Sequence, residues 1–404
     1  MSEGTRMNDR TRPLQGIRVV EMTHMVMGPT VGVILGDLGA DVIKVEPVKG
    51  DNTRRLLGSG AGYFPMYNRN KRSLAVDTTV PAGKAVVDAL LAEADVFVEN
   101  FRPGAMAENG WDAETLARKH PRLISCSAKG FLGGPYESRT ALDEVAQMMG
   151  GLAYMTGLPG KPMRAGASVI DVTGGMFCVI GILAALEQRH RTGRGQHVTA
   201  SLFETTAFLC GQHMAQGAVT GRPAPPMTQR LSAWGVYDIF DTADADQVFI
   251  AVVSDTQWRK FCASFAFEQF LADRSLDTNS GRVQQREHTM GVLREEFRRW
   301  TKAELMAKLE SIGLPFAPVS KPEDLFDDPH LNAEGGLVPL TLPDGRATKL
   351  PALPLAMDGA RFGTWRDLPR IGQHTHAALR DAGYDDAQID ALAAQGVVHL
   401  PDAA

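Results

Sequence analysis

The sequence predicts an α/β protein whose larger domain is built on a doubly wound parallel sheet. Three observations carry this prediction. Residues 16–46 (GIRVVEM, PTVGVILGDLG, ADVIKVE) read as strand, helix and strand, a compact βαβ unit. Two later apolar runs, at 95–101 and 122–130, alternate with helical segments. Each run is apolar throughout, as strands covered on both faces are, so helices should lie on both sides of the sheet.

The elements that follow extend the same pattern. Helices are predicted at 82–93 and 113–119, between the strands of the sheet. Val169 and Ile170 read as the end of a buried strand, and residues 174–190 as a helix that is apolar almost all round. RTGRGQHVTASLF then supplies a glycine-rich turn and another strand.

The composition of the chain and its pattern of predicted elements change near residue 220, which indicates a second domain. GRPAPPMTQR is rich in proline, and two hairpin-like strands follow (WGVYDIF, QVFIAVV), with helices from Thr256 and from Arg286 to Ser311. A strand-turn-strand and two short helices end the chain, and their pattern fits either domain. We predict a large Rossmann-like domain at 14–200, a linker at 201–228, a small α+β domain at 229–330 and a C-terminal segment at 331–404.

Composition excludes several classes of protein. With 42 Lys and Arg against 47 Asp and Glu, the net charge of −5 argues against a nucleic-acid-binding surface. The four cysteines have neither CxxC spacing nor a neighbouring His pair, so we expect buried thiols, a reducing compartment and no metal. The long apolar segment at 176–186 is shorter than the roughly 20 residues of a membrane span. A cytoplasmic protein without a membrane partner is expected.

Asp171 is the first candidate for chemistry, because ASVIDVTGGMF places an acid between two core elements. An Asp at a helix start accepts backbone hydrogen bonds and is kept ionised by the helix dipole, so it can be an ordinary N-cap. Gly174 and Gly175 would also let a ligand approach the backbone closely. A carboxylate beside open amides suits a nucleophile with an oxyanion site. The residues alone leave both interpretations open.

Nucleotide chemistry receives partial support. Glu46 ends the second strand where a ribose-binding acid would lie, but Gly28, Gly32 and Gly36 depart from G-x-G-x-x-G spacing, and no P-loop pattern is present. Basic residues interleaved with aromatics in DNTRR and YNRNKRSL suit a ligand with phosphates and a base, or form a solvated loop. His24 follows the first strand, at the edge where open α/β sheets bind ligands, and is either a site or a core residue.

Taken together, the segments resemble the family III CoA-transferases, the group of formyl-CoA transferase and carnitine CoA-transferase, to which the alpha-methylacyl-CoA racemases are related. The resemblance spans nearly the whole chain and is carried by the order of PLQGIRVVEMTHMVMGP, LGADVIKVEPVKGD, YNRNKRSLAVD, DVFVENFRPGAM, ISCSAKGF and IGILAALEQRHRTGRGQHVTASLFE. It implies that Asp171 is the nucleophile. Asp171 would attack an acyl-CoA to give a mixed anhydride, and the CoA thiolate would then form an aspartyl-CoA thioester that an acceptor carboxylate resolves.

The resemblance also implies a binding site and an assembly. CoA is then a substrate, and the partners are acyl-CoA and a carboxylic acid, with no tightly bound cofactor and no metal. The family fold is an interlocked homodimer whose C-terminal segment returns to the large, CoA-binding domain. The implied CoA-binding residues are His24, Met25, Val26, Met27, Lys71, Arg72, Asn100, Phe101, Arg102, Met106 and Lys129.

Departures from the pattern narrow the reaction. Val26 stands where formyl-CoA transferase has a Gln, and MTQRLSAWG has no counterpart of its glycine-rich loop, which argues against formyl-CoA and oxalate. Leu142 replaces the racemases' His, so proton transfer at an α-carbon lacks one base. SAWGVYDIF and IGLPFAPVSKPEDLF look more like the branch that passes CoA from succinyl-CoA to a dicarboxylate, whose free end Arg164 or Arg230 could bind.

We therefore predict a CoA-transferase that uses succinyl-CoA and a dicarboxylate. Intramolecular CoA transfer within one dicarboxylic acid is an alternative that uses the same nucleophile. An acyl-CoA racemase or isomerase is a second alternative, and it predicts that solvent deuterium enters C2 of an acyl-CoA. A non-catalytic CoA-binding protein is a third, and it predicts that Asp171→Ala leaves function intact.

Overall fold

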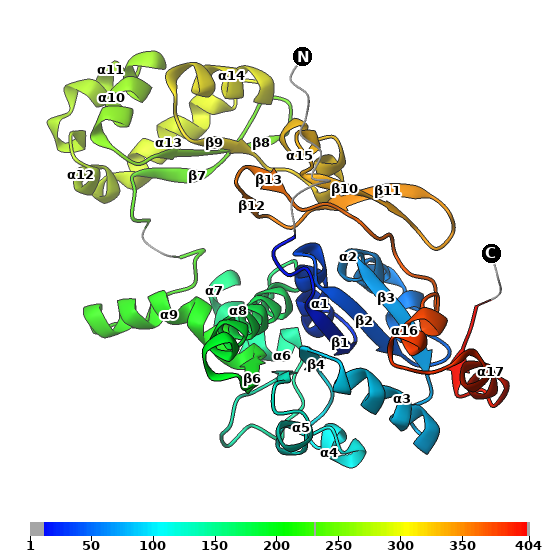
Figure 1. Cartoon of the computed structure of the whole chain (residues 1–404). Helices are drawn as coiled ribbons and strands as arrows, with labels where there is room; N and C mark the ends of the chain where they lie inside the picture. Colours follow the sequence, from blue (N-terminus) through cyan, green and yellow to red (C-terminus); the bar gives the residue numbers. More distant parts are fainter. Residues whose placement is uncertain (1–11, 230–231, 402–404) are drawn as a thin grey trace. The chain divides into compact units, whose positions relative to one another are not determined.

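The computed structural model describes residues 12–229 and 232–401, which divide into two compact units (Figure 1). The large unit contains the described residues up to Thr228 and those from Pro329 onward, and the small unit runs from Gln229 to Asp328. The C-terminal segment thus belongs to the large unit, where the helix α16 (Thr375–Asp381) lies beside the strand β3 (Lys71–Val76) in Figure 1. Each unit is described by itself below.

A seven-stranded sheet forms the centre of the large unit, in the order β14-β3-β2-β1-β4-β5-β6. All neighbours are parallel except β14, which pairs antiparallel with β3. The predicted parallel α/β sheet is confirmed. The strands are β1 (Arg18–Met22), β2 (Asp41–Glu46), β3 (Lys71–Val76), β4 (Val96–Glu99), β5 (Ile124–Lys129), β6 (His197–Ser201) and β14 (Val398–His399).

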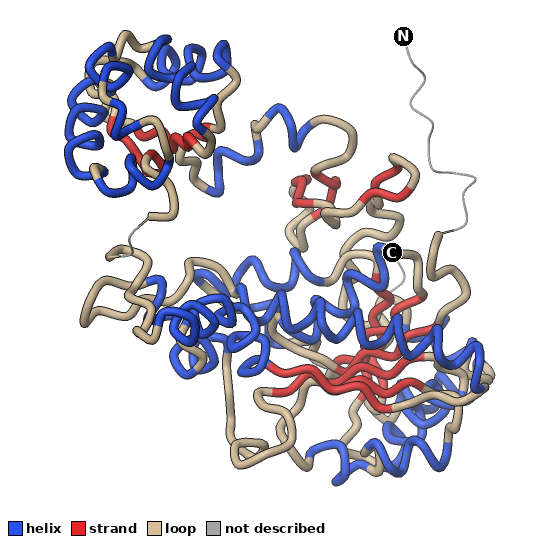
Figure 2. Tube along the Cα trace, turned by 90° about the vertical axis from the view of Figure 1, so that its left-hand side faces the viewer, coloured by secondary structure: helices blue, strands red, loops and turns tan. Residues whose placement is uncertain are grey.

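Helices cover both faces of this sheet (Figure 2). Adjacent β1 residues show why: Val19 belongs to the core that packs on α1 and α8, and Val20 to the core on the opposite face. A strand buried on both faces reads as continuously apolar, which is the pattern that made it recognisable. The helices of the large unit are α1 (Met27–Asp37), α2 (Tyr63–Tyr67), α3 (Pro81–Ala92), α4 (Ala105–Asn109), α5 (Ala113–Lys119), α6 (Asp143–Met149), α7 (Leu152–Thr156), α8 (Val169–Thr192), α9 (Leu202–Thr220), α15 (Pro329–Asn332), α16 (Thr375–Asp381) and α17 (Asp386–Ala394).

The small unit has its own core around a three-stranded antiparallel sheet. Its strands are β7 (Val236–Asp241), β8 (Gln247–Val252) and β9 (Phe316–Pro318), and its helices are α10 (Asp255–Ser264), α11 (Glu268–Ala272), α12 (Asn279–Gln284), α13 (Arg286–Phe297) and α14 (Lys302–Ile312). Two short antiparallel pairs complete the described strands of the large unit: β10 (Leu337–Thr341) with β11 (Ala347–Pro351), and β12 (Ala356–Met357) with β13 (Ala360–Arg361).

Four expectations about elements need correction. Val169 and Ile170 are the first residues of α8 and not the end of a strand. The segment 201–228, predicted as a linker, contains the 19-residue helix α9, which packs on α6 and α8 because its apolar residues find partners there. The helical stretch from Arg286 to Ser311 is two helices, because Thr301 begins α14 with a capping box.

The fourth correction is β3, which the sequence pattern missed. Its residues are all buried, although Lys71 and Arg72 are typical of a solvated loop. Lys71 forms an ion pair with Glu21 at 2.7 Å, and Arg72 one with Asp41 at 3.0 Å. Charged residues enter a buried strand when each one has a partner of opposite sign.

Helix α8 is long and apolar enough, by length and composition, to cross a membrane, and among the described residues it alone meets that test. Its 24 residues exceed the apolar segment recognised in the sequence. In the structure α8 packs against α1, β5 and β6 and contributes Ile182 and Ala185 to the core. A core helix of a large α/β unit satisfies the same criterion.

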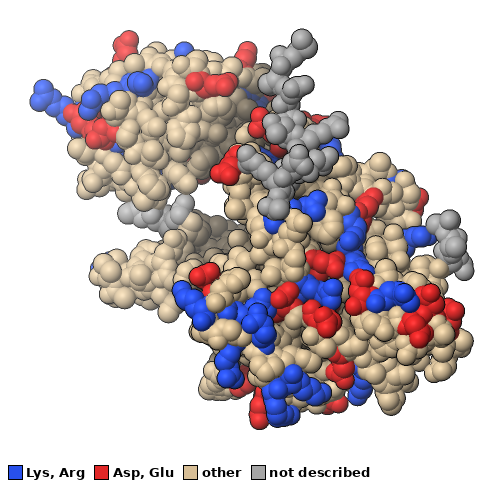
Figure 3. Space-filling view, viewed as in Figure 1, with Lys and Arg blue, Asp and Glu red and all other residues tan. Residues whose placement is uncertain are grey.

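On the face of the large unit that Figure 3 shows, basic and acidic side chains are interspersed, which agrees with the small net charge. The four cysteines are buried free thiols, as predicted.

Candidate active site

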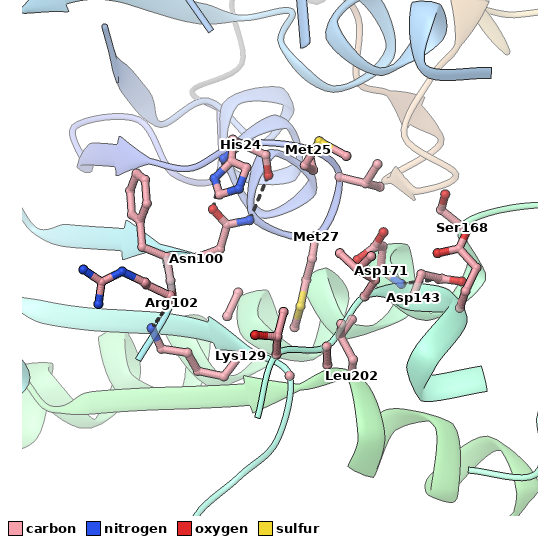
Figure 4. Close-up of a pocket in the computed structure, with 18 of the residues that line it drawn as sticks. His24, Met25, Met27, Asn100, Arg102, Lys129, Asp143, Ser168, Asp171 and Leu202 are labelled. Atoms are coloured by element: carbon pink, nitrogen blue, oxygen red, sulfur yellow. Dashed lines mark hydrogen bonds between the residues drawn. The ribbon is translucent and has the colours of Figure 1, made fainter. Parts of the chain in front are cut away.

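A cavity of about 400 Å³ opens where the loops after β1, β4 and β5 meet the starts of α6 and α8 (Figure 4). Ligands bind at this edge in open parallel sheets, because the loops there converge. The cavity brings together nine of the residues singled out in the sequence, namely His24, Met25, Val26, Met27, Asn100, Phe101, Arg102, Lys129 and Asp171.

Asp171 is the third residue of α8, so its interpretation as the N-cap is wrong. Ser168 holds the N-cap position, and its side chain makes no capping hydrogen bond. The cap comes from another helix: Oδ2 of Asp143, the first residue of α6, accepts hydrogen bonds from the backbone N–H groups of Ile170 at 2.8 Å and Asp171 at 3.0 Å. The carboxylate of Asp171 therefore remains available to the cavity.

The electrostatic surroundings of Asp171 oppose ionisation, contrary to the sequence-based expectation. Burial is the largest cause that raises the pKa of Asp171, the carboxylates of Asp143 and Glu144 add to it, and together they bring this pKa to about 7. The helix dipole does not dominate, because Asp143 already occupies the free N–H groups at the start of α8. A carboxyl group that titrates near neutrality is more basic than an ordinary Asp, which is a property of catalytic acids, bases and nucleophiles.

Gly174 and Gly175 allow close packing of the helix α1 and not, as expected, close approach of a ligand. A Cβ on Gly174 would lie 2.8 Å from Cε of Met27, and one on Gly175 would lie 2.8 Å from the backbone oxygen of Met27 and 2.9 Å from Cβ of Thr30. The first turn of α1 therefore packs directly on the first turns of α8. This packing brings Met27 beside Asp171 in the cavity (Figure 4).

The loop before α1 has a constrained backbone. Met25 has a φ of 64°, in the left-handed region that a non-glycine residue adopts at a cost. Asn100 fixes the neighbouring residue from both sides: its Oδ1 accepts from the His24 N–H at 3.0 Å, and its Nδ2 donates to the His24 carbonyl at 2.8 Å. The N-cap of α1, Val26, makes no side-chain capping hydrogen bond, and Pro29 has no N–H, so the N–H groups of Met27 and Gly28 are the ones in this turn that an oxyanion could use.

Two buried lysines anchor the ends of this loop. Nζ of Lys44 donates to the Thr23 carbonyl at 2.8 Å, and Nζ of Lys71 donates to the Pro29 carbonyl at 3.0 Å. Both ammonium groups also face Glu21, Lys71 at 2.7 Å and Lys44 at 3.6 Å. All three side chains have no exposed surface. This buried cluster therefore holds both ends of the loop that lines the cavity.

Lys71 and Arg72 therefore do not fit the nucleotide-binding role that the resemblance implied for them. Lys71 is fully buried, and Arg72 is held in ion pairs with Asp41 at 3.0 Å and Asp381 at 2.8 Å. Neither residue lines the cavity. Glu46 is likewise structural, since its carboxylate pairs with Arg54 at 2.6 Å, which agrees with the absence of a dinucleotide fingerprint.

The cations of the cavity differ in whether they have acidic partners. Lys129 pairs with Glu99 and Arg102 with Glu108, each at 2.7 Å. Arg139 lines the cavity with its guanidinium 4.3 Å from the Tyr136 ring centroid, and no ion pair to it is found among the described residues. No sequence pattern pointed to Arg139, because isolated arginines in loops are common.

Two residues suggested for a substrate carboxylate do not support that role. Arg164 pairs with Glu144 at 2.9 Å and does not line the cavity, and Arg230 lies outside the described residues.

The cavity continues toward a second pocket. Met106 lies in this neighbouring pocket of about 310 Å³, which shares Pro103, Lys129 and Glu137 with the first. Among the described residues there is no cluster of three or more metal-ligating side chains. Further lining residues that the sequence did not single out as binding or catalytic groups are Tyr63, Pro103, Ala128, Gly130, Glu137, Arg139, Thr140, Ala141, Leu142, Asp143, Glu144, Ser168 and Leu202.

Comparison with known proteins identifies the family. A model of CoA-transferase family III matches residues 14–375. The chain is 34% identical over 391 residues to a succinate–glutarate CoA-transferase of Agrobacterium fabrum, covering 93% of this chain and 97% of the relative. It is 31% identical to the succinyl-CoA:glutarate CoA-transferase of Mus musculus, covering 96% and 91%. A crystal structure of a CAIB/BAIF family protein from Brucella suis is 33% identical and superimposes with a TM-score of 0.81, covering 92% of this chain and all of that one. With family-wide sequence matches and the same fold, this chain belongs to the CoA-transferases of family III.

Proposed function

We propose that the protein transfers CoA from succinyl-CoA to a dicarboxylic acid, with glutarate as the first acceptor to test, and that Asp171 forms the covalent intermediates. The observation that carries the proposal is the placement of Asp171, a carboxyl group with a pKa of about 7, in the cavity that collects the expected CoA-binding residues. The two relatives named for succinate, succinyl-CoA and glutarate support the choice of substrates.

The proposed reaction needs no group beyond the substrates and Asp171. The carboxylate of Asp171 attacks the thioester carbonyl of succinyl-CoA. The C–S bond breaks, CoA departs as the thiolate, and an aspartyl–succinyl anhydride remains on the enzyme. The thiolate then attacks the Asp171 carbonyl, releasing succinate and leaving aspartyl-CoA. The acceptor carboxylate attacks the aspartyl-CoA thioester, which expels the CoA thiolate and gives an anhydride between Asp171 and the acceptor. The thiolate then attacks the acceptor's carbonyl in this anhydride, so that the new acyl-CoA forms and the Asp171 carboxylate is free again. Each step exchanges one acyl bond for another.

The residues around Asp171 have separate tasks in this scheme. Burial removes the water that makes a carboxylate a poor nucleophile. The uncapped first turn of α1 and the fixed loop at Met25 would donate N–H groups to the oxyanion that develops during each attack. The cavity would hold the thiolate near Asp171 between its departure and its return, so the second attack is effectively unimolecular.

Arg139 is the side chain we assign to the free carboxylate of the acceptor. It lines the same cavity as Asp171, and among the described residues its guanidinium has no acid to displace. A guanidinium binds a carboxylate with two parallel hydrogen bonds, which would favour a dicarboxylate over a monocarboxylate. Lys129 and Arg102 are less suited, since Glu99 and Glu108 already pair with them.

We also propose the interlocked homodimer of the family. Supporting this, α8 and α9 present a row of apolar side chains to solvent in the single chain. Phe208 is 73% exposed, Met214 67% and Val219 87%, and on α8 Ile180 is 58% exposed. Monomeric proteins rarely expose a large continuous apolar surface, so a second copy would cover it. Light scattering at micromolar concentration should give twice the chain mass of 43.7 kDa; a monomer would contradict the proposal.

The test of the function is trapping on Asp171. The protein is incubated with succinyl-CoA, treated with borohydride or hydroxylamine, digested, and searched by mass spectrometry for a modified peptide containing Asp171, with Asp171→Asn as the control. An adduct on Asp171, together with glutaryl-CoA production from glutarate, supports the proposal. If an adduct forms only with another acyl-CoA, that acyl-CoA replaces succinyl-CoA as the proposed donor. If no acyl-CoA gives an adduct, the covalent role of Asp171 is refuted.

Two alternative functions make predictions that other assays distinguish. Intramolecular transfer would consume a dicarboxylic acid monothioester and return its isomer without a separate acceptor. A racemase would exchange the C2 proton in D₂O; Leu142 lines the cavity at the position where the racemases have His, so we expect no exchange.

A further inference from the structure

We propose that Asp143 is the positioning residue of Asp171: its carboxylate binds the start of α8 and fixes the nucleophile in the cavity. This inference rests on the proposed role of Asp171. The contacts are specific, because a single oxygen, Oδ2 of Asp143, accepts from the N–H of Ile170 at 2.8 Å and of Asp171 at 3.0 Å. Asp143 is 5% exposed, so water does not compete for these hydrogen bonds.

Asp143 acts together with Gln147, one turn later on α6. Gln147 is fully buried; its Nε2 donates to Oδ1 of Asp143, and its Oε1 accepts from the backbone N–H of Ala165 at 2.8 Å. Two side chains of α6 thus hold three backbone N–H groups between Ala165 and Asp171. The segment that leads into α8 is fixed at both of its ends, and this gives Asp171 one orientation.

The use of an acid for this cap has a chemical consequence. Asp143 has no ion pair among the described residues, so its charge is balanced by N–H donors and by the positive end of the 24-residue helix α8. The other titratable or charged groups around Asp171 are Glu144 on α6, the two tyrosines of α2, and the charged or titratable residues of the cavity wall. By residue they are Glu144, Tyr63, Tyr67, His24, Arg102, Lys129, Glu137 and Arg139. Asp143 therefore orders the nucleophile and also makes it more basic, and the two effects can be separated by mutation.

Five variants separate the effects of hydrogen bonding, charge and helix capping as such. Asp143→Ala removes both. Asp143→Asn removes the charge and turns an amide NH₂ toward the NH₂ of Gln147, and the double change Asp143→Asn with Gln147→Glu restores a matched donor and acceptor. Glu144→Gln removes a neighbouring charge without touching the cap. Asp385→Asn changes a helix-capping Asp of α17, whose Oδ1 accepts from the Gln388 N–H at 2.8 Å, and controls for capping as such.

Two measurements apply to every variant: hydrogen exchange of the peptide covering 165–172, and the pH dependence of kcat and KM for transfer. In Asp143→Ala we expect faster exchange at 165–172 and a loss of about 10²-fold in kcat, with KM for succinyl-CoA changed by less than about threefold. The double variant should regain slow exchange and at least about tenfold in kcat over Asp143→Asn. Removing a neighbouring negative charge, as Glu144→Gln does, should move the acid limb of the pH profile for kcat down by about one pH unit.

Two results would overturn the inference: unchanged exchange at 165–172 in Asp143→Ala, or a kcat within about twofold of wild type in that variant. If Asp143→Ala does not fold, the comparison of Asp143→Asn with the double variant decides the question. Failure of the proposed function looks different. In that case Asp171→Asn retains transfer and no adduct forms, while hydrogen exchange in the Asp143 variants still reports whether Asp143 orders the start of α8.

Discussion

Replacing the proposed nucleophile should make the protein more stable as well as inactive. Asp171→Asn removes a carboxylate that the folded protein holds in a desolvated place beside Asp143 and Glu144, while keeping the shape of the side chain. The pKa of this carboxyl is about 7 in the folded chain against an ordinary value of 3.8. At 1.36 kcal/mol per pH unit, full ionisation costs the folded state about 4 kcal/mol, which is an upper bound because the cavity admits water.

The sign of the pH dependence follows from linkage. A carboxyl whose pKa is raised by folding binds its proton more tightly in the folded state, so the cost appears as pH rises above 3.8 and is complete above about 7. Asp171→Asn should therefore stabilise little at pH 4 and most at pH 8. For a unit of this size we expect a rise in Tm of about 3 to 6 °C at pH 8.

Calorimetry of wild type and Asp171→Asn at pH 4, 6 and 8 measures this difference. The control is Glu114→Gln, because Glu114 is an exposed acid in the first turn of α5, where a negative charge is ordinarily stabilising by a few tenths of a kcal/mol. The control should show a small loss of stability that hardly changes with pH. Equal or lower stability of Asp171→Asn at pH 8 would refute the raised pKa and the electrostatic description of the site.

Three further perturbations test other parts of the site. Arg139→Gln should raise KM for glutarate about tenfold and leave KM for a monocarboxylate such as butyrate unchanged; a rise in KM for succinyl-CoA alone would instead assign Arg139 to a CoA phosphate. Lys71→Met should lower the free energy of unfolding by about 3 to 5 kcal/mol in urea titrations, because the buried Glu21 loses its nearer cation and keeps Lys44 at 3.6 Å. Adding Glu21→Gln should recover part of that loss, and no recovery would show that Lys71 and Glu21 are not coupled. Gly32→Ala should destabilise strongly, because its Cβ would lie 1.6 Å from Oε2 of Glu21; wild-type thermal stability would show that the loop support tolerates movement.

The parts predicted from the sequence were those that depend on local patterns. The apolar strands of the large sheet and the division near residue 229 follow from periodicity and composition, because a strand covered by helices on both faces must be apolar along its length. The segments of the family likeness led to Asp171 and to eight of the eleven expected CoA-binding residues that line the cavity. β3 was missed because its Lys71 and Arg72 are neutralised by acids that are distant in sequence, Glu21 and Asp41.

The environment of Asp171 could not be predicted in the same way, because it depends on contacts between distant segments. An acid near a helix start reads as a cap that the dipole keeps ionised, and that reading assumes that the helix N–H groups are free. Asp143, 28 residues earlier, has already taken them. Two carboxylates therefore lie at the first turn of α8: that of Asp143, from α6, is bound to the backbone, and that of Asp171 is excluded from it. The excluded carboxylate is the group left to react, and its pKa is raised first by burial and then by the charge of the carboxylate that caps its helix.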